Sequence, residues 1–350
     1  MVKRNLFIDI SWIEDSYSGG ARFSVENILR AIIANKKFNN FDVIFILNNK
    51  ILEKYKFIKN YKKIFLTDKK YLNFFLRWFL LFFLYKKDNS QIYFCPNIYT
   101  PIFKLNFKII NLFHDAQWIK FPNNFSLLRK FWIKLNILIC KIKSDKIIFT
   151  SKSLKKDLMK RFKFTNKVKI IHIPFFKKNL NFKKKYNLKK NSFIICISSR
   201  LPHKNLETIE ALFLKYKDVI KQKLIIAGLG KDKIYKKYKN IRYMQFIDEQ
   251  KKIWLIKNSK CVLLPSKYEG FGMVAIETVI NGGMAIASNL RVYKELIGNN
   301  ANYVSSPENI ENWLEKIVNL KKNKKLNIKK ILRKFDHKII SDQYFKCIAN

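Results

Sequence analysis

Two glutamates, Glu269 and Glu277, frame a glycine-containing loop in the last third of the 350-residue chain. Gly270 and Gly272 follow the first glutamate, and the stretch 273–280 contains neither glycine nor proline, which is typical of a helix. The backbone N–H groups at a helix start bind phosphate, and glycine lets a phosphate approach them closely. Carboxylates beside an anion site are suited to accept hydrogen bonds from hydroxyl groups. The pattern therefore predicts a sugar-nucleotide site, and the plainer interpretation is a turn with two surface glutamates.

Two other loops carry residues that suit a phosphate. Arg200 and Lys204 follow an apolar run at 193–197, and two cations at this point could neutralise a diphosphate. In so basic a chain they could equally be solvated surface cations. Gly19 and Gly20 stand between a predicted strand and a predicted helix, where backbone amides could meet a phosphate or sugar, or where the chain simply turns.

A histidine and an aspartate, His114 and Asp115, end a predicted strand at 108–113. Open parallel sheets bind ligands outside the carboxyl ends of their strands. His114 is therefore a candidate ligand-binding residue, and a structural histidine is the alternative.

The size of the chain exceeds one typical core and predicts two domains, for which 48% hydrophobic residues are sufficient. The first residues, MVKRNLFIDISW, predict a strand rather than a signal peptide, and no stretch reaches the ~20 apolar residues of a spanning helix. The cysteines are scattered and form no C-x-x-C pair, which is typical of buried apolar residues in a reducing cytoplasm and indicates no metal site. They are Cys95, Cys140, Cys196, Cys261 and Cys347.

The net charge of +46 is concentrated in the first half of the chain and the linker that follows it. Residues 51–200 contain 35 Lys and Arg against 6 Asp and Glu, a net charge of +29. This distribution indicates a surface that faces anionic lipid or another polyanion. A coding bias toward A/T-rich codons is the alternative, and it would explain the amount of charge but not its location.

Two segments of this basic half predict helices with unusual apolar surfaces. Residues 71–85, YLNFFLRWFLLFFLY, are apolar on nearly all sides, with Arg77 as their only charge and lysines on both flanks. They suit a helix lying in a membrane interface, or a helix buried inside the domain. Residues 125–143 predict a basic amphipathic helix.

The run Glu-Gly-Phe-Gly-Met-x-x-x-Glu from Glu269 to Glu277 resembles the E-x7-E signature of the GT-B glycosyltransferases, in particular the large retaining group called family 4. Three further features occur in the order found in that family. They are the pair Gly19-Gly20, the pair His114-Asp115 and the pair Lys204-Asn205. Of these features only the E-x7-E motif is specific by itself. Met284 stands where many relatives have proline, a departure at a strand start that does not touch the chemistry.

The resemblance implies a GT-B fold, an α/β architecture in which two Rossmann-like doubly wound domains face each other across a cleft. We expect an acceptor-binding domain at 1–172, a basic linker at 173–190 and a nucleotide-sugar-binding domain at 191–329. A C-terminal helix at 330–350 would cross back to the first domain.

The resemblance also implies roles for single residues. Glu269 and His114, with Asp115 beside it, would act at the donor sugar, and Glu277 would hold the ribose hydroxyls. Arg200 and Lys204 would meet the diphosphate, although a short loop leaves the register of Arg200 open and His203 could take its place. The other implied donor-binding positions are Gly19, Gly20, Phe246, Ile247, Gly270, Phe271, Gly272, Met273 and Val274.

The implied activity is retaining, metal-independent transfer of a hexose of the mannose, rhamnose or glucose type. The donor would be a GDP-, UDP- or dTDP-sugar, and no cofactor is expected. The acceptor would be a saccharide or a lipid-linked saccharide of cell-surface polysaccharide, lipopolysaccharide or O-antigen synthesis. No two aspartates are separated by one residue, so the metal-binding Asp-x-Asp of the other main transferase fold is absent. We expect a cytoplasmic protein that contacts the inner face of the membrane.

Two alternatives remain open at this point. The charge alone would fit a protein that binds a polyanion or a membrane surface, although no nucleic-acid-binding motif is present and we expect no nucleic-acid partner. The GT-B fold would also fit a sugar-nucleotide epimerase, which would convert the donor with no acceptor present.

Overall fold

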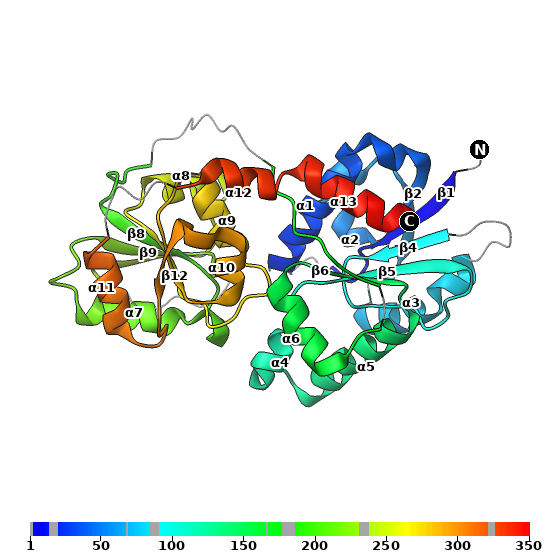
Figure 1. Ribbon diagram of the computed structural model, residues 1–350, viewed down its shortest axis with the longest axis horizontal. Helices are drawn as coiled ribbons and strands as arrows, with labels where there is room; N and C mark the ends of the chain where they lie inside the picture. Colours follow the sequence, from blue (N-terminus) through cyan, green and yellow to red (C-terminus); the bar gives the residue numbers. More distant parts are fainter. Residues whose placement is uncertain are drawn as a thin grey trace. The chain divides into compact units, whose positions relative to one another are not determined.

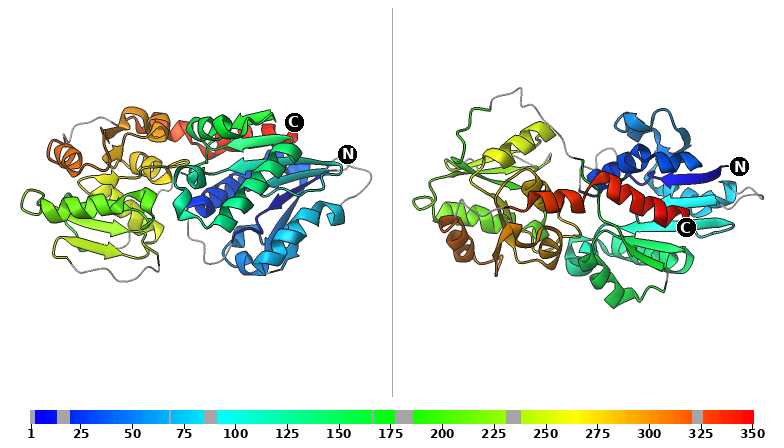
Figure 2. Two further views of the ribbon diagram at one scale, coloured as in Figure 1. Left: turned by 90° about the horizontal axis from the view of Figure 1, so that it is seen from below. Right: turned by 45° about the horizontal axis from the view of Figure 1, so that its top comes forward.

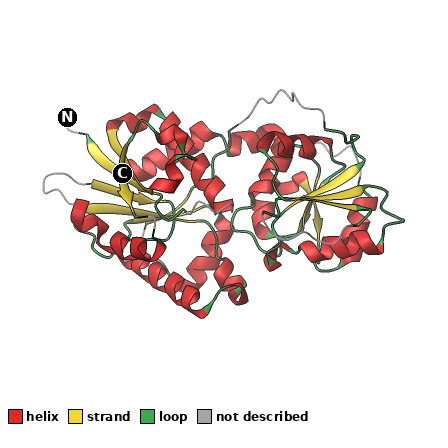
Figure 3. Ribbon diagram, turned by 180° about the vertical axis from the view of Figure 1, so that it is seen from behind, coloured by secondary structure: helices red, strands yellow, loops and turns green. Residues whose placement is uncertain are grey.

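The computed structural model describes residues 3–13, 20–67, 69–84, 91–165, 167–176, 186–230, 238–320 and 326–350. It divides into two compact units. The first consists of Met1–Trp118, Phe125–Phe176 and Phe335–Asn350, and the second of Ile119–Asn124 and Lys177–Lys334. Each is built on a parallel sheet covered by helices (Figures 1 and 3).

The first unit contains a seven-stranded sheet in which every neighbouring pair is parallel, in the order β3-β2-β1-β4-β5-β6-β7. The strands are β1 Arg4–Asp9, β2 Phe41–Asn48, β3 Lys62–Leu66, β4 Gln91–Cys95, β5 Phe107–Phe113, β6 Lys146–Phe149 and β7 Lys167–Ile170. The helices are α1 Gly20–Ala34, α2 Asn49–Leu52, α3 Lys70–Leu84, α4 Gln117–Lys120, α5 Leu127–Lys143, α6 Lys152–Phe162 and α13 His337–Ala349, and α4 crosses the border between the units.

Alternating side chains of the strands explain why helices cover both faces of this sheet. Leu6 and Ile8 of β1 point to the face where α1 and α13 pack, whereas Phe7 points to the face where Leu80 and Leu81 of α3 pack. The strands are therefore apolar on both sides, as expected for a parallel sheet covered by two helical layers.

The C-terminal helix expected at 330–350 is divided into two helices, α12 Ile328–Lys334 and α13 His337–Ala349. α12 ends at Lys334 and α13 begins at His337, because the Asp336 side chain accepts the backbone N–H groups of Lys338 and Ile339. α13 then lies beside α1 (Figure 2).

Three cations from strands of the first unit satisfy the last carbonyl groups of α13. Lys146 Nζ donates to the Cys347 carbonyl at 2.8 Å, and Lys108 Nζ and an Arg4 guanidinium nitrogen donate to the next two carbonyls. The last carbonyl groups of a helix have no hydrogen-bond partner within the helix, and positive charge is favourable at its C-terminal end. Burial, together with the neighbouring Lys146 charge, lowers the pKa of Lys108 to about 8.

The second unit contains a six-stranded parallel sheet in the order β10-β9-β8-β11-β12-β13. Its strands are β8 Phe193–Ile197, β9 Lys223–Ala227, β10 Ile241–Met244, β11 Val262–Leu264, β12 Ala285–Ser288 and β13 Ala301–Val304. Its helices are α7 Leu206–Lys215, α8 Glu249–Asn258, α9 Met273–Ile280, α10 Arg291–Ile297, α11 Ile310–Val318 and α12 Ile328–Lys334. This is the strand order of a dinucleotide-binding fold. The predicted α/β architecture of two Rossmann-like domains is confirmed.

All five cysteines are free and buried, as predicted. Among the described residues, no helix combines the length and the hydropathy that crossing a bilayer requires.

Candidate functional site

The candidate site of the second unit lies where the order of its strands reverses, between the neighbouring strands β8 and β11. In doubly wound sheets, ligands bind outside the carboxyl ends of these two strands. The loop after β8 leads to Lys204, and the loop after β11 contains Glu269. The fold thus brings together two predicted site residues that are 65 positions apart.

The Glu269 carboxylate is held by three side chains. Its Oε1 accepts hydrogen bonds from Lys204 Nζ at 2.7 Å, Ser266 Oγ at 2.7 Å and Tyr293 OH at 3.4 Å. Burial raises the pKa of Glu269, but the Lys204 charge and the hydrogen bonds from Lys204 and Ser266 outweigh it, so the pKa lies below its ordinary value. Burial and the Glu269 charge raise the pKa of Tyr293 well above its usual range. Glu269 is therefore an ionised acceptor, and Tyr293 keeps its proton as a donor.

Gly272 caps the N-terminus of α9 in the left-handed region, at φ +85°. A Cβ atom at this position would lie 2.7 Å from Cε1 of Tyr293, so the ring that contacts Glu269 also excludes a larger residue here. The predicted loop-to-helix turn is confirmed, with α9 at Met273–Ile280. Its first backbone N–H groups belong to the predicted donor-binding positions Met273 and Val274, and Gly270 and Phe271 lie in the preceding turn.

Glu277 is the fifth residue of α9 and forms an ion pair with Lys252 of α8. The distance from Lys252 Nζ to Glu277 Oε1 is 2.7 Å, and the two side chains are 21% and 13% exposed. The second carboxylate oxygen is not engaged in this bond. A group bound near the start of α9 could therefore reach Glu277 without breaking the pair.

Arg200 differs from Lys204 in its surroundings. Both terminal nitrogens of its guanidinium bond to the Glu210 carboxylate, and the Tyr243 hydroxyl donates to the same carboxylate at 2.9 Å. A role for Arg200 at the donor stays a prediction.

His203, considered as an alternative to Arg200, is buried in the loop between them, and burial, aided by the Lys204 charge, lowers its pKa to about 4. It is therefore neutral at pH 7. Phe246 and Ile247 follow β10 at the same edge of the sheet; Phe246 is exposed and Ile247 is partly buried.

The candidate residues of the first unit lie at the carboxyl ends of its strands. His114 Nε2 lies 2.8 Å from the Pro96 carbonyl, which can only accept, so Nε2 carries the proton. Its Nδ1 is buried with no hydrogen-bond partner among the described residues, and burial lowers the pKa of His114 to about 4. Nδ1 is thus unprotonated and has a lone pair that can accept a hydrogen bond. Asp115 is exposed and accepts the Gln117 backbone N–H.

The N-terminal glycine loop is described only in part. Gly20 is the first residue of α1, and among the described residues no atom beyond its chain neighbours and its own helix lies within 4 Å of a Cβ built there. Gly19 lies outside the described residues.

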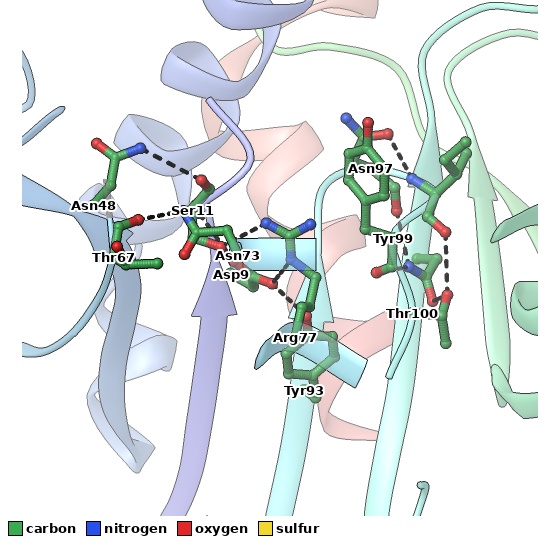
Figure 4. A network of polar contacts seen from close by, with 12 residues as sticks. Asp9, Ser11, Asn48, Thr67, Asn73, Arg77, Tyr93, Asn97, Tyr99 and Thr100 are labelled. Atoms are coloured by element: carbon green, nitrogen blue, oxygen red, sulfur yellow. Dashed lines mark hydrogen bonds and ion pairs between the residues drawn. The ribbon is translucent and has the colours of Figure 1, made fainter. Parts of the chain in front are cut away.

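Sequence reasoning missed the side chains that contact Glu277, Glu269 and Arg200. Lys252, Tyr293 and Glu210 lie 25, 24 and 10 positions from the residues they contact, and no local spacing marks them. It also missed a buried polar network at the carboxyl end of β1 (Figure 4). There Arg77 Nε of α3 lies 3.0 Å from Asp9 Oδ2, and the Tyr93 hydroxyl donates to the same oxygen.

The chemistry of the second-unit site is that of hydrogen bonding and charge. Among the described residues, no group of three or more His, Cys, Asp or Glu is arranged to hold a metal ion. A lysine, a helix start and two carboxylates could together hold a ligand that carries both an anion and hydroxyl groups.

Comparisons with known proteins identify a family domain in the chain. Residues 178–335 match the family "Glycosyl transferases group 1", so a domain of this family is present in the chain. An uncharacterized glycosyltransferase of Methanocaldococcus jannaschii is 25% identical over 199 residues, 50% of this chain and 51% of that protein. The O-antigen chain mannosyltransferase RfbU of Salmonella typhimurium is 22% identical over 228 residues, 59% of each chain. The matched segment thus spans just over half the length of these relatives.

Solved structures resemble the chain over its whole length. A sucrose-phosphate synthase from Thermosynechococcus elongatus gives a TM-score of 0.69 at 15% identity, covering 99% of this chain and 98% of that one. HepE from Anabaena, in complex with UDP and glucose, gives 0.68 at 13% identity and covers all of both chains. At these identities the likeness shows the fold, and the predicted GT-B class is confirmed.

Proposed function

We propose that this protein is a glycosyltransferase that moves a hexose from a nucleoside-diphosphate sugar to a saccharide or lipid-linked saccharide acceptor. The observation that carries the proposal is the arrangement of Lys204, Glu269 and Glu277 around the start of α9. It offers a cation and backbone amides to a diphosphate, and carboxylate oxygens to sugar hydroxyls. The group 1 domain in the same unit supports it.

Each of the three side chains has a distinct part in this proposal. Lys204 donates one of its three hydrogens to Glu269, which leaves others for phosphate oxygens. Glu277 would accept from the ribose hydroxyls with the oxygen that Lys252 does not bind. Glu269, kept ionised by Lys204, would accept from a hydroxyl of the donor sugar and hold its ring in place.

The proposed chemistry is stabilisation of the leaving diphosphate by fixed charges. A preorganised ammonium and backbone N–H groups favour the negative charge that develops as the glycosidic bond breaks. We propose, from the resemblance to family 4, that the configuration at the anomeric carbon is retained and that no metal is required. His114 would take part in the first unit as an acceptor of a sugar hydroxyl, because Nδ1 is its unprotonated nitrogen.

The proposed donor and pathway are based on the descriptions of similar proteins. HepE was solved with UDP and glucose, and RfbU is described as an O-antigen mannosyltransferase. We therefore propose a GDP-, UDP- or dTDP-hexose as donor and cell-surface polysaccharide or lipopolysaccharide as the destination.

Thermal unfolding with GDP, UDP, dTDP and their hexose esters tests the donor site. A ligand at ~100 times its dissociation constant should add about 2.7 kcal/mol to the free energy of unfolding. Glu277→Gln and Lys204→Met should each weaken nucleotide binding roughly tenfold or more, because each removes a charged hydrogen-bonding group. Glu311→Gln is the matched control, since Glu311 also pairs with a lysine, at 2.9 Å, but belongs to α11.

The proposal fails if no nucleotide stabilises the protein, or if the Glu277 and Glu311 variants bind equally well. Slow hydrolysis of the bound donor, followed by NMR, then tests the reaction. The α-anomer of the free hexose should form first from an α-linked donor if configuration is retained, and EDTA should leave the rate unchanged. Conversion of the donor to a second sugar nucleotide would instead identify an epimerase.

A further inference from the structure

The helix α3 of the first unit buries two polar side chains and exposes five large apolar ones. Asn73 and Arg77 are buried, at 7% and 3% exposure. On the opposite side, large apolar side chains face outward, and the most exposed, at 73%, is Phe83. The set is Leu72, Phe75, Phe79, Phe82 and Phe83. A helix at a surface that meets only water has the reverse pattern, because burying a charge is costly and exposing phenyl rings gains nothing.

The buried side of α3 is held in place by specific bonds. Arg77 Nε lies 3.0 Å from Asp9, Arg77 Nη2 donates to Ser11 Oγ at 2.8 Å, and the guanidinium lies over the Tyr99 ring at 4.9 Å (Figure 4). Rotating α3 to bury its phenylalanines would break the ion pair and leave Asp9 unpaired, a change that costs several kcal/mol.

The neighbouring helix α5 repeats this arrangement. It buries Asn136, while its exposed apolar side chains are Leu127, Leu128, Phe131, Leu138 and Ile142. The Trp78 ring of α3 stacks on the Trp132 ring of α5 with centroids 5.2 Å apart, so the two helices lie side by side (Figure 1). We call the exposed apolar side chains of α3 and α5 the docking surface. It holds half of the exposed large apolar side chains of the described residues.

The charged side chains of α3 and α5 are all cations. Neither α3 nor α5 contains an aspartate or glutamate. The cations of α5 are Arg129, Lys130, Lys134, Lys141 and Lys143. An apolar face bordered by lysines matches a bilayer, whose acyl region accepts phenyl and aliphatic side chains while anionic headgroups attract lysines.

From the buried Arg77, the outward phenylalanines and the bordering lysines, we propose that the docking surface binds an anionic phospholipid bilayer. This proposal does not depend on the proposed donor chemistry. It would place the first unit at a membrane surface. Phe75, Phe79, Phe82 and Phe83 would enter the boundary between headgroups and acyl chains.

Sedimentation with phosphatidylcholine vesicles, with and without phosphatidylglycerol, tests the proposal. The wild-type protein should sediment with the anionic vesicles, and added salt should weaken this. Phe82→Gln/Phe83→Gln should bind roughly tenfold or more weakly, since it removes two phenyl rings from the acyl boundary. Val219→Gln/Val318→Gln removes two side chains of similar exposure, 53% and 55%, from the second unit and should bind like wild type.

A lysine variant and a fluorescent label distinguish an anionic bilayer from a second copy of the chain as the partner of the docking surface. Lys134→Gln/Lys141→Gln should lose binding to anionic vesicles. Because all five native cysteines are buried, Phe83→Cys can be labelled selectively with the polarity-sensitive dye NBD. Its emission should shift to the blue on anionic vesicles, and the same label at Val318→Cys should not shift.

Three results would overturn the proposal. They are no binding to anionic vesicles at low salt, equal binding by the Phe82/Phe83 variant and its control, and a lipid-free dimer that the Phe82/Phe83 variant alone dissociates. The last result would mean that a second copy of the chain covers this face. Because donor binding is measured without lipid, failure here leaves the transferase assignment untouched, and the reverse also holds.

Discussion

Replacing Gly272 with alanine should destabilise the second unit by about 2–4 kcal/mol. Alanine at φ +85° costs about 1 kcal/mol, because a Cβ atom disfavours the left-handed region. The new Cβ would lie 2.7 Å from Cε1 and 3.2 Å from Cδ1 of Tyr293. That ring is 2% exposed and must shift within a packed environment, which adds about 1–3 kcal/mol.

Gly282→Ala is the matched control for this prediction. Gly282 has a similar φ of +78°, but the nearest atom to its built Cβ is Ile328 Cδ1, at 4.0 Å. It should therefore lose only the conformational term of about 1 kcal/mol. In thermal unfolding, each kcal/mol should lower the Tm of a unit of this size by about 2–4 °C.

Nucleotide binding gives a second measurement on the same pair of variants. Moving Tyr293 displaces the hydroxyl that lies 3.4 Å from Glu269, so Gly272→Ala should lose nucleotide stabilisation while Gly282→Ala keeps it. If both variants lose equal stability, the steric argument is wrong. If Gly272→Ala unfolds early but binds nucleotide as wild type does, Tyr293 has no part in the site.

Two other predictions concern buried charges. Arg77→Met and Asp9→Asn should each lower the free energy of unfolding by about 3–5 kcal/mol, because each leaves a buried partner uncompensated. The double variant should recover part of this loss in urea titrations, and strictly additive losses would contradict the pairing. The pKa of His203, about 4, lies below its ordinary 6.5, so the unfolded state binds more protons between these values. The His203 side chain therefore contributes up to about 3 kcal/mol to the free energy of unfolding above pH 6.5, and this contribution is lost as the pH falls toward 4. His203→Gln should flatten the stability curve in that window, and an unchanged curve would refute this assignment.

The fold followed from local patterns, because strands and helices of this chain are apolar at regular spacings. The predicted helix at 273–280 has the bounds of α9, and the turn before it contains the left-handed glycine that such a turn requires. The alternation of strands and helices was enough to predict parallel sheets. Asp336 ends the last long helical pattern and could have been read as an N-cap, because an aspartate before an apolar periodic run is a known start signal.

The contacts of the site could not be predicted, because they join residues from different loops. In a chain with 71 Lys and Arg, nothing local selects Lys252 as the partner of Glu277, or Glu210 as the partner of Arg200. The orientation of α3 could not be predicted from the sequence either. A helix that is apolar on nearly all sides has no polar stripe to mark its outer face, and only Asp9, at the end of β1, determines that Arg77 points inward.

The two sheets differ at the place where the order of their strands reverses. Between β8 and β11, the lysine and carboxylate of the second unit are 23% and 16% exposed, so a ligand can reach both. Asp9 at the end of β1 and Tyr93 of β4 instead meet Arg77, and the ion-paired side chains are 4% and 0% exposed. Arg77 is thus far less accessible to a ligand than Lys204. The bonds of Arg77 hold α3 with its phenylalanines outward. The same architecture thus carries the donor site that we propose in one unit, and in the other it holds the helix that we propose meets the membrane.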